Sequence, residues 1–256
     1  MLNIVLPIAG RGSRFAVAGY TLPKPLIPVH GTPMISLVAA NVRPARPHRF
    51  IFIAQREHLE TTDMGAVLER SAPGCAIVAI DGVTEGAACT VLAAKAHIDT
   101  ADALMLANSD QYVDASIDAY LASLDRTGAD GLIMTFPADD PKWSFVRRDA
   151  GGRVTDVVEK VVVSTEATVG IYNFRRGTDF VRAAERMIAR DRRVNGDLHV
   201  EAERACPASG VPRQQIGAVA GVVQRPLRQQ QPRRRAGAQH HRPEPERRIG
   251  ELVGRG

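Results

Sequence analysis

The sequence predicts an α/β fold, in which a mostly parallel sheet is covered by helices on both faces. Three observations support this prediction. The chain has 256 residues, 45% hydrophobic and 24% charged, which fits one globular domain or one domain plus an appendage. Short apolar segments alternate with helix-compatible segments through the first half, as in βαβ units. After Pro137 the pattern changes to that of a small antiparallel insertion.

Five short segments in the first half have the length and apolar composition of buried strands. They are residues 4–8, 49–54, 75–80, 103–107 and 131–136. The segments between them are compatible with helices, and Pro33 stands near the first turn of one of them, where proline is tolerated. These predicted helices are residues 33–42, 57–70, 86–97 and 114–124.

The second half begins with two segments that we expect to pair as an antiparallel hairpin. Residues 143–148 and 153–160 flank the turn 149–152, which contains two adjacent glycines. Residues 167–174 have the composition of a further strand, and residues 178–190 have the apolar spacing of an amphipathic helix. The insertion is therefore predicted to be followed by a last strand and helix.

Composition divides the chain into a body, residues 1–203, and a tail, residues 204–256. The tail contains eleven Arg, no Lys and three Glu, a net charge of +8. The whole chain carries +5, so the body carries −3. An acidic body does not support nucleic-acid binding by the domain itself.

The tail has no Phe, Tyr or Trp and is dominated by Arg, Pro, Gln, Ala and Gly. Such a composition buries little apolar area, so we expect residues 204–256 to be poorly ordered. Three interpretations stay open: an arm that binds polyanions, a solvated tail, or the translation of a wrong reading frame in a GC-rich gene.

Several classes of protein are excluded or disfavoured. No apolar run approaches the roughly 18 residues of a membrane-spanning helix. Three widely spaced cysteines, Cys75, Cys89 and Cys206, form neither a disulfide framework nor a zinc pattern. The first residues lack the basic start and cleavage site of a signal peptide. We therefore expect a cytoplasmic protein that does not act at a membrane.

The strongest motif follows the first predicted strand. Gly10 and Gly12 lie in a loop where glycine lets the backbone approach a ligand and present consecutive N–H groups to an anion. Arg14 and Lys24 add cationic donors suited to phosphate oxygens, and prolines on both sides of Lys24 stiffen its backbone. The spacing differs from those of the P-loop and the dinucleotide-binding fingerprint.

This block resembles the nucleotidyltransferases that make nucleotide-activated sugars and related compounds. Their hallmark is G-x-G-[ST]-R-[LF], followed by P-K-P-L-x-P-[VI]. The chain has Gly-Arg-Gly-Ser-Arg-Phe at residues 10–15 and Pro-Lys-Pro-Leu-Ile-Pro-Val at residues 23–29. The resemblance covers roughly residues 2–200. It implies a Rossmann-like sheet, with the antiparallel insertion on the acceptor side. It also implies transfer of a nucleotide from a nucleoside triphosphate to a phosphorylated acceptor, with release of pyrophosphate.

The resemblance also implies roles for individual residues. Arg14 and Lys24 are the expected catalytic residues, and Asp110, after the fourth strand, is the expected Mg²⁺ ligand. Asp197 is a candidate for the second metal carboxylate that the family usually has. The expected nucleotide-binding residues are Ala9, Gly10, Gly12, Ser13, Asp81 and Gly86. The expected acceptor-binding residues are Glu159, Lys160 and Gly170.

The chemistry of such a transfer fits these residue types. The acceptor phosphate is already anionic, so it needs no strong base, and catalysis comes from alignment and charge neutralisation. Structural alternatives remain for several positions. Asp81 can be a turn residue, Gly86 a helix N-cap and Asp110 a capping residue before residues 114–124. Glu159 and Lys160 can be an exposed charge pair on the hairpin.

The nucleotide is predicted from Asp81, five residues before Gly86. A carboxylate accepts a hydrogen bond from the cytosine amino group but not favourably from the O4 atom of uracil or thymine, which favours CTP. The sequence Asn108-Ser-Asp-Gln111 adds a resemblance to capsule-associated cytidylyltransferases. The alternatives are a sugar-1-phosphate thymidylyl- or uridylyltransferase, a non-catalytic nucleotide-binding homologue, and a polyanion-binding protein acting through its tail. A homo-oligomer is left open.

Overall fold

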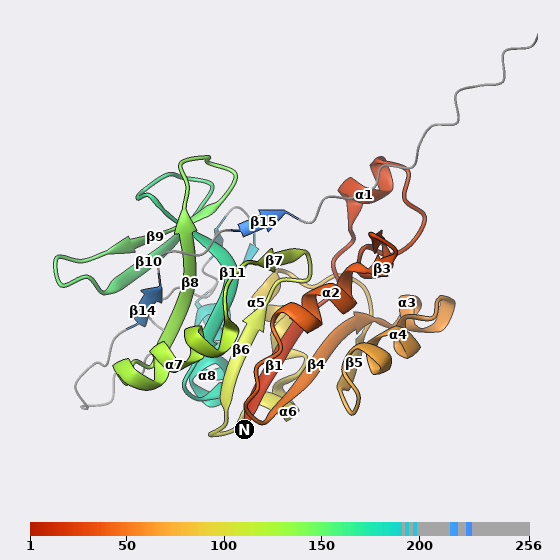
Figure 1. Ribbon diagram of the computed structural model, residues 1–256, viewed down its shortest axis with the longest axis horizontal. Helices are drawn as coiled ribbons and strands as arrows, with labels where there is room; N and C mark the ends of the chain where they lie inside the picture. Colours follow the sequence, from red (N-terminus) through yellow and green to blue (C-terminus); the bar gives the residue numbers. More distant parts are fainter. Residues whose placement is uncertain (191–192, 195–196, 199–215, 220–223, 227–256) are drawn as a thin grey trace, which may run out of the picture.

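The computed structural model describes residues 1–190, 193–194, 197–198, 216–219 and 224–226 (Figure 1). Its centre is a nine-stranded sheet in the order β10-β9-β11-β6-β1-β4-β5, with β8 also beside β11 and β14 beside β8. Two halves meet in this sheet. The half that contains β1 is parallel, and the half that contains β11 is largely antiparallel.

The parallel half consists of β1 (Leu2–Pro7), β4 (His48–Gln55), β5 (Ala76–Ile80) and β6 (Ala103–Ala107). The other half consists of β8 (Gly131–Pro137), β9 (Ser144–Arg148), β10 (Val154–Glu159) and β11 (Glu166–Phe174). The strand β11 is antiparallel to both β6 and β8, and its Ala167 is in register with Phe145 of β9. It therefore joins the parallel sheet to the β9–β10 hairpin.

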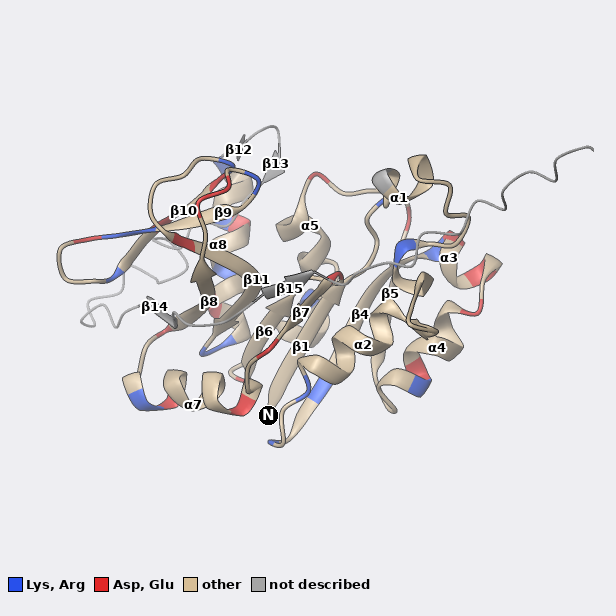
Figure 2. Cartoon of the chain, turned by 45° about the horizontal axis from the view of Figure 1, so that its top comes forward, with Lys and Arg blue, Asp and Glu red and all other residues tan. Residues whose placement is uncertain are grey.

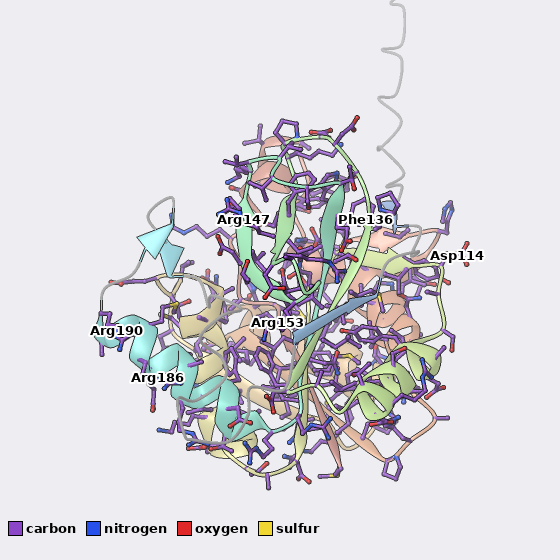
Figure 3. The ribbon with its side chains drawn as sticks, turned by 90° about the vertical axis from the view of Figure 1, so that its left-hand side faces the viewer. Asp114, Phe136, Arg147, Arg153, Arg186 and Arg190 are labelled. Carbon is purple, nitrogen blue, oxygen red and sulfur yellow. The ribbon has the colours of Figure 1, made fainter. Side chains whose placement is uncertain are left out.

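Helices cover both faces of the sheet, as the sequence predicts. One face packs against α2 (Met34–Asn41), α4 (Met64–Ser71) and α7 (Ile117–Thr127). The opposite face packs against α5 (Ala87–Leu92), α6 (Lys95–Ile98) and α8 (Gly177–Ala189). Figure 3 shows α8 along one side of the molecule, with Arg186 and Arg190 marking its C-terminal end, and Arg147 on the hairpin.

The alternation of side chains along the strands explains why the sheet needs helices on both faces. Ile4 and Leu6 of β1 belong to the hydrophobic cluster on one face, and Val5 between them belongs to the cluster on the other. All three side chains are fully buried. A parallel strand that is apolar on both sides can be buried only when both faces are covered. Charged residues lie mainly on the surrounding helices and the hairpin (Figure 2).

Two predicted helices are each divided in the structure. The segment 57–70 forms α3 (Arg56–Thr61) and α4, because Thr61 and Thr62 donate their hydroxyl protons to carbonyls four residues earlier and Thr62 has an extended backbone. The segment 86–97 forms α5 and α6, with residues 93 and 94 between them. The prediction of a single helix was wrong at both places.

The remaining elements are short. They are α1 (Ser13–Val17), the 3-10 helix η1 (Lys24–Leu26), β2 (Pro28–Val29), β3 (Thr32–Pro33), β7 (Gln111–Val113), β12 (Arg193–Val194), β13 (Asp197–Leu198), β14 (Ile216–Val219) and β15 (Gln224–Pro226). From the predicted tail, β14 pairs in parallel with β8, and β15 pairs with β7. The boundary at residue 203 and the reading of the tail stay predictions. No helix in the described part of the chain is long and apolar enough to cross a membrane.

Candidate active site

A cavity of about 540 Å³ lies at the carboxyl ends of β1 and β6, the edge where open α/β sheets bind ligands. Four segments line it: the end of β1 with the loop and the start of α1 that follow it, residues 24–25 of η1, the segment 83–90, and the residues that follow β6. Seven of the predicted site residues are among its lining. They are Ala9, Gly10, Gly12, Ser13, Lys24, Gly86 and Asp110.

The glycine-rich loop is anchored at its start and compact at its end. Ile8 donates its backbone N–H to the Ile53 carbonyl at 2.8 Å, and the Gln55 amide donates to the Ala9 carbonyl at 2.6 Å. Gly12 has φ +58°, and a Cβ there would lie 3.2 Å from Lys24 Cβ. A side chain at Gly12 would therefore be strained and would press against Lys24. No pattern in the sequence indicates that Gln55 supports this loop.

Lys24 and Asp110 form an ion pair at the cavity. Lys24 Nζ lies 2.7 Å from Asp110 Oδ2 and 5.7 Å from the centroid of the Phe15 ring. The Lys24 side chain is 21% exposed and that of Asp110 is 46% exposed. Among the described lining residues, Lys24 is the one lysine and Asp110 is the one carboxylate. The charge of the cavity is therefore concentrated on this pair.

Gly170 supports the loop that carries Asp110. Its carbonyl accepts a hydrogen bond from the Asn108 N–H at 3.0 Å, and its φ is +81°. A Cβ at Gly170 would lie 2.6 Å from Asn108 Cγ and 2.7 Å from Gln111 Oε1, closer than atoms can approach. Gly170 does not line the cavity. Its observed contacts are with the Asp110 loop, and its predicted contact with the acceptor stays a prediction.

Gly86 is the N-cap of α5, with φ 128° and ψ 170°, a backbone conformation that favours glycine. Its carbonyl lies within hydrogen-bond distance of two hydroxyls, those of Thr84 at 3.0 Å and Thr90 at 3.2 Å. The two hydroxyl oxygens lie 2.5 Å apart. Both threonines line the cavity, and neither is among the site residues predicted from the sequence.

Three other predicted residues lie away from the cavity. Asp81 is exposed and forms an ion pair with Arg56, with Nε and Oδ1 2.9 Å apart. Glu159 and Lys160 stand at the end of β10, where Lys160 Nζ lies 2.6 Å from Glu159 Oε1. Lys160 has φ 57° and donates its N–H to the Trp143 carbonyl. The structure therefore brings Glu159 and Lys160 together on the hairpin and not at the glycine-rich loop.

Glu159 faces a buried phenol of β11. Burial raises the pKa of Tyr172, a hydrogen bond with Thr168 lowers it, and the negative charge of Glu159 raises it. The Tyr172 hydroxyl lies 3.1 Å from Thr168 Oγ1. The Tyr172 side chain also packs against the hydrophobic cluster under the hairpin, which contains Ile133 and Val146.

Two predicted residues have side chains outside the described part of the structure. Arg14 is the second residue of α1, directly after the glycine-rich loop. Asp197 lies in the short strand β13, which contacts α5. The roles predicted for both side chains stay predictions.

The fit of the site to Mg²⁺ depends on Asp110. No group of three or more His, Cys, Asp or Glu residues in the described part of the chain is arranged to hold a metal. Magnesium often binds through one or two carboxylates together with waters and substrate phosphates. Asp110 is half-exposed and opens onto a cavity large enough for phosphates. The residues present therefore fit a cation that enters with a nucleotide.

Comparison with known proteins agrees with this geometry. The profile of the MobA-like NTP transferase domain matches residues 4–173. The bifunctional protein GlmU of Cupriavidus metallidurans is 30% identical over 163 residues, which cover 62% of this chain and 33% of that protein. The GlmU of Burkholderia multivorans is 32% identical over 163 residues. The chain thus spans about a third of the length of these curated relatives.

Solved structures share the fold. The nucleoside-diphosphate-sugar pyrophosphorylase of Vibrio cholerae RC9 superposes with a TM-score of 0.67 at 24% identity, covering 85% of this chain and 92% of that one. A UDP-glucose pyrophosphorylase complexed with UDP-glucose has a TM-score of 0.67 at 17% identity, covering 88% and 92%. The resemblance to capsule-associated cytidylyltransferases stays a prediction. From the match over residues 4–173, the chain belongs to the family of MobA-like NTP transferase domains.

Proposed function

We propose that the protein transfers a nucleoside monophosphate from a nucleoside triphosphate to a phosphorylated sugar or related acceptor, with release of pyrophosphate. The observation that carries this proposal is the Lys24–Asp110 pair beside the glycine-rich loop. A cation and a carboxylate at one end of a cavity, next to backbone that glycine leaves open, suit a metal-bound triphosphate.

The reaction needs alignment and charge neutralisation more than proton transfer. An oxygen of the acceptor phosphate attacks the α-phosphorus and forms the new P–O bond. The bond between the α-phosphorus and the bridging oxygen to the β-phosphate breaks, and pyrophosphate leaves with that electron pair. No proton has to be removed from the attacking oxygen. The cavity lining contains no His or Cys among the described residues, which is consistent with this chemistry.

Each residue of the cavity has a proposed part in this step. Lys24 neutralises phosphate oxygens, while Gly10 and Gly12 leave their backbone open to the triphosphate. Arg14 is proposed as a second phosphate donor. Asp110 is proposed to hold Mg²⁺, which when bound would screen the negative charge of the triphosphate. Lys24 would then contact a phosphate and Asp110 would contact the cation, so the two side chains would no longer neutralise one another.

The acceptor is proposed to bind towards the hairpin. Glu159 and Lys160 offer one acceptor and one donor at the end of β10, and Gly170 connects β11 to the Asp110 loop. Asp197 is proposed as a second metal carboxylate, since β13 contacts α5, whose first residue Ala87 lines the cavity. A role in capsule or other surface-polysaccharide synthesis and a cytoplasmic location remain predictions from the sequence.

CTP is the proposed nucleotide, with uridylyl or thymidylyl transfer as the alternative. The prediction of CTP rests on Asp81, and this carboxylate is paired with Arg56 outside the cavity. Because of that pairing, uridylyl and thymidylyl transfer should be tested beside cytidylyl transfer. If Asp81 reads cytosine, it has to leave Arg56 first, and Asp81→Asn would then weaken CTP binding.

The test is a screen of four nucleoside triphosphates against a panel of phosphorylated sugars and alditols, with pyrophosphate release as the readout. We expect turnover with one or two triphosphates and loss of turnover when EDTA removes divalent cations. Titration calorimetry in parallel identifies a non-catalytic homologue, which would bind a triphosphate without releasing pyrophosphate from any pair. Absence of both binding and turnover would refute the proposed function.

A further inference from the structure

The cavity has one charged wall and one uncharged wall. Lys24 and Asp110 stand beside the glycine-rich loop. The wall formed by the segment 83–90 contributes only uncharged lining residues among those described, namely Val83, Thr84, Gly86, Ala87 and Thr90. A triphosphate belongs at the charged wall. The uncharged wall is left for the neutral base, and its hydroxyls are then placed to contact the edge of that base.

The hydroxyl protons of Thr84 and Thr90 are both used inside the protein. The Gly86 carbonyl has two lone pairs and three neighbouring donors: the Thr90 N–H at 3.1 Å and the two threonine hydroxyls. The N–H occupies one lone pair, so one hydroxyl takes the other. The remaining hydroxyl proton points to the neighbouring threonine oxygen, 2.5 Å away. What the pair presents to the cavity is therefore oxygen lone pairs, an acceptor surface.

We infer that the Thr84–Thr90 hydroxyl pair binds the nucleobase by accepting a hydrogen bond from an N–H on its edge. This inference rests on the proposed function and names residues that contact the base of its nucleotide. Cytosine offers such a donor at its N4 amino group, and uracil offers one at N3. Val83, 49% exposed and part of the same wall, gives the flat face of the ring an apolar contact.

The pair is a neutral alternative to Asp81, the residue that the sequence predicts to contact the base. Asp81 is held by Arg56 and does not line the cavity, whereas both threonines do. Neutral oxygens also avoid the cost of bringing a second carboxylate close to a triphosphate. Discrimination by neutral acceptors is modest, because one neutral hydrogen bond contributes about 0.5–1.5 kcal/mol.

The experiment compares isosteric variants that remove the hydroxyl with variants that keep it. Thr84→Val and Thr90→Val are measured beside Thr84→Ser and Thr90→Ser in the full-length protein. Calorimetry gives the Kd for CTP, UTP and inorganic tripolyphosphate, which has phosphates and no base. We expect each valine variant to weaken the preferred nucleotide about three- to tenfold, while tripolyphosphate binding changes less than twofold. The serine variants should restore most of the nucleotide affinity.

Analogues identify the donor on the base. If the wild type prefers CTP, it should bind the analogue without the N4 amino group, the triphosphate of the pyrimidinone riboside, only as tightly as a valine variant binds CTP. If the wild type prefers UTP, it should bind N3-methyl-UTP only as tightly as a valine variant binds UTP. Equal losses for nucleotide and tripolyphosphate would overturn the inference, since they indicate a collapsed cavity wall. Unchanged nucleotide affinity in both valine variants would overturn it as well.

Failure of this inference and failure of the proposed function give different results. A wild-type protein that binds a nucleotide selectively and never releases pyrophosphate refutes the transferase function, and the binding comparison still tests the threonines. If the wild type turns over normally and both valine variants keep its nucleotide affinity, only the role of Thr84 and Thr90 is refuted.

Discussion

Lys24 Nζ lies 2.7 Å from Asp110 Oδ2, although Lys24 belongs to η1 and Asp110 follows β6, far later in the sequence. The pair thus connects the loop that precedes α2 with the carboxyl end of the parallel sheet. Neither charge is deeply buried, so the pair contributes little to folding. Its position between two cavity walls makes it a better candidate for ligand binding than for stability.

Replacing Lys24 or Asp110 should abolish pyrophosphate release without unfolding the protein. Loss of one aligned charge-stabilising donor usually costs about 10²–10³ in rate. We expect Lys24→Ala and Asp110→Ala each to lose at least that factor, with melting temperatures close to that of the wild type. Pyrophosphate release measures the first effect, and thermal unfolding by circular dichroism measures the second.

Lys95→Ala is the matched control for this prediction. Lys95 is 47% exposed, pairs with Glu185 and lies on α6, away from the cavity. Its loss should leave turnover unchanged. Near-normal turnover in the Lys24 or Asp110 variant would contradict the assigned roles.

Gly170→Ala should destabilise the protein and disturb the Asp110 loop. Positive φ costs a non-glycine residue about 1–3 kcal/mol, and the new Cβ would also overlap Asn108 and Gln111. Gly152→Ala is the control, because Gly152 has φ +79° and nothing lies within 4 Å of its added Cβ. Urea unfolding should show a larger loss for Gly170→Ala. Equal losses would mean that the close approach to Asn108 has no energetic consequence.

Asn173→Leu should stabilise the fold. Asn173 is 2% exposed, its register neighbours Met105 and Leu132 are buried in the same hydrophobic cluster, and neither amide atom has a hydrogen-bond partner in the described structure. A buried unsatisfied polar group costs about 1–3 kcal/mol, and leucine has the same side-chain branching. We expect a gain of that order in the free energy of unfolding, measured by urea titration.

Asn3→Leu provides the contrast. Asn3 is also fully buried, but its Oδ1 accepts a hydrogen bond from Arg49 Nη2 at 3.0 Å. Leucine would leave that guanidinium without this partner, so this variant should gain nothing or lose stability. Stabilisation by Asn3→Leu and not by Asn173→Leu would show that the desolvation argument is wrong.

Cys75 should react slowly with alkylating reagents at neutral pH. Burial, the charge of Glu69 and a hydrogen bond to Glu69 raise the pKa of the Cys75 thiol to about 11. Because the folded state holds this proton more tightly, its contribution to stability is complete below the usual thiol pKa of about 8.5. That contribution is lost as the pH rises towards 11. Peptide mapping after iodoacetamide treatment should show modification increasing up to that pH.

Glu69→Gln tests the cause of this shift. It removes the negative charge and leaves the burial of Cys75 in place, so the pKa of the thiol should fall but stay above its ordinary value. A thiol that reacts in the folded wild type as fast as in the denatured chain at pH 8 would contradict the prediction.

Most strands could be predicted from the sequence because they are short runs of mainly apolar residues, which is typical of buried strands. The predicted segment 103–107 coincides with β6, and 49–54 lies within β4. The helix divisions could not be predicted from apolar spacing. At Thr61 and Thr62 they depend on side-chain hydrogen bonds to the backbone, which compete with helix continuation.

The candidate site shows the same limit. The loop residues of the motif were found because their types and spacing are unusual. Thr84 and Thr90 were not found, since the meaning of their hydroxyls depends on their distances to the Gly86 carbonyl. The contact between Gly170 and Asn108 was not found either. It exists only because β11 is added antiparallel beside β6, which brings distant parts of the sequence together.

The attachment of the β9–β10 hairpin has a consequence for engineering. Its register contact with β11 in the described structure is the single pair of Ala167 and Phe145, while β11 itself is in register with β6 over four residue pairs. The hairpin also packs through buried Val146 and Val154 against Ile133 of β8, so an exchange of residues 138–165 has to keep this cluster. Such an exchange would replace Glu159 and Lys160 together and leave the residues at the glycine-rich loop in place.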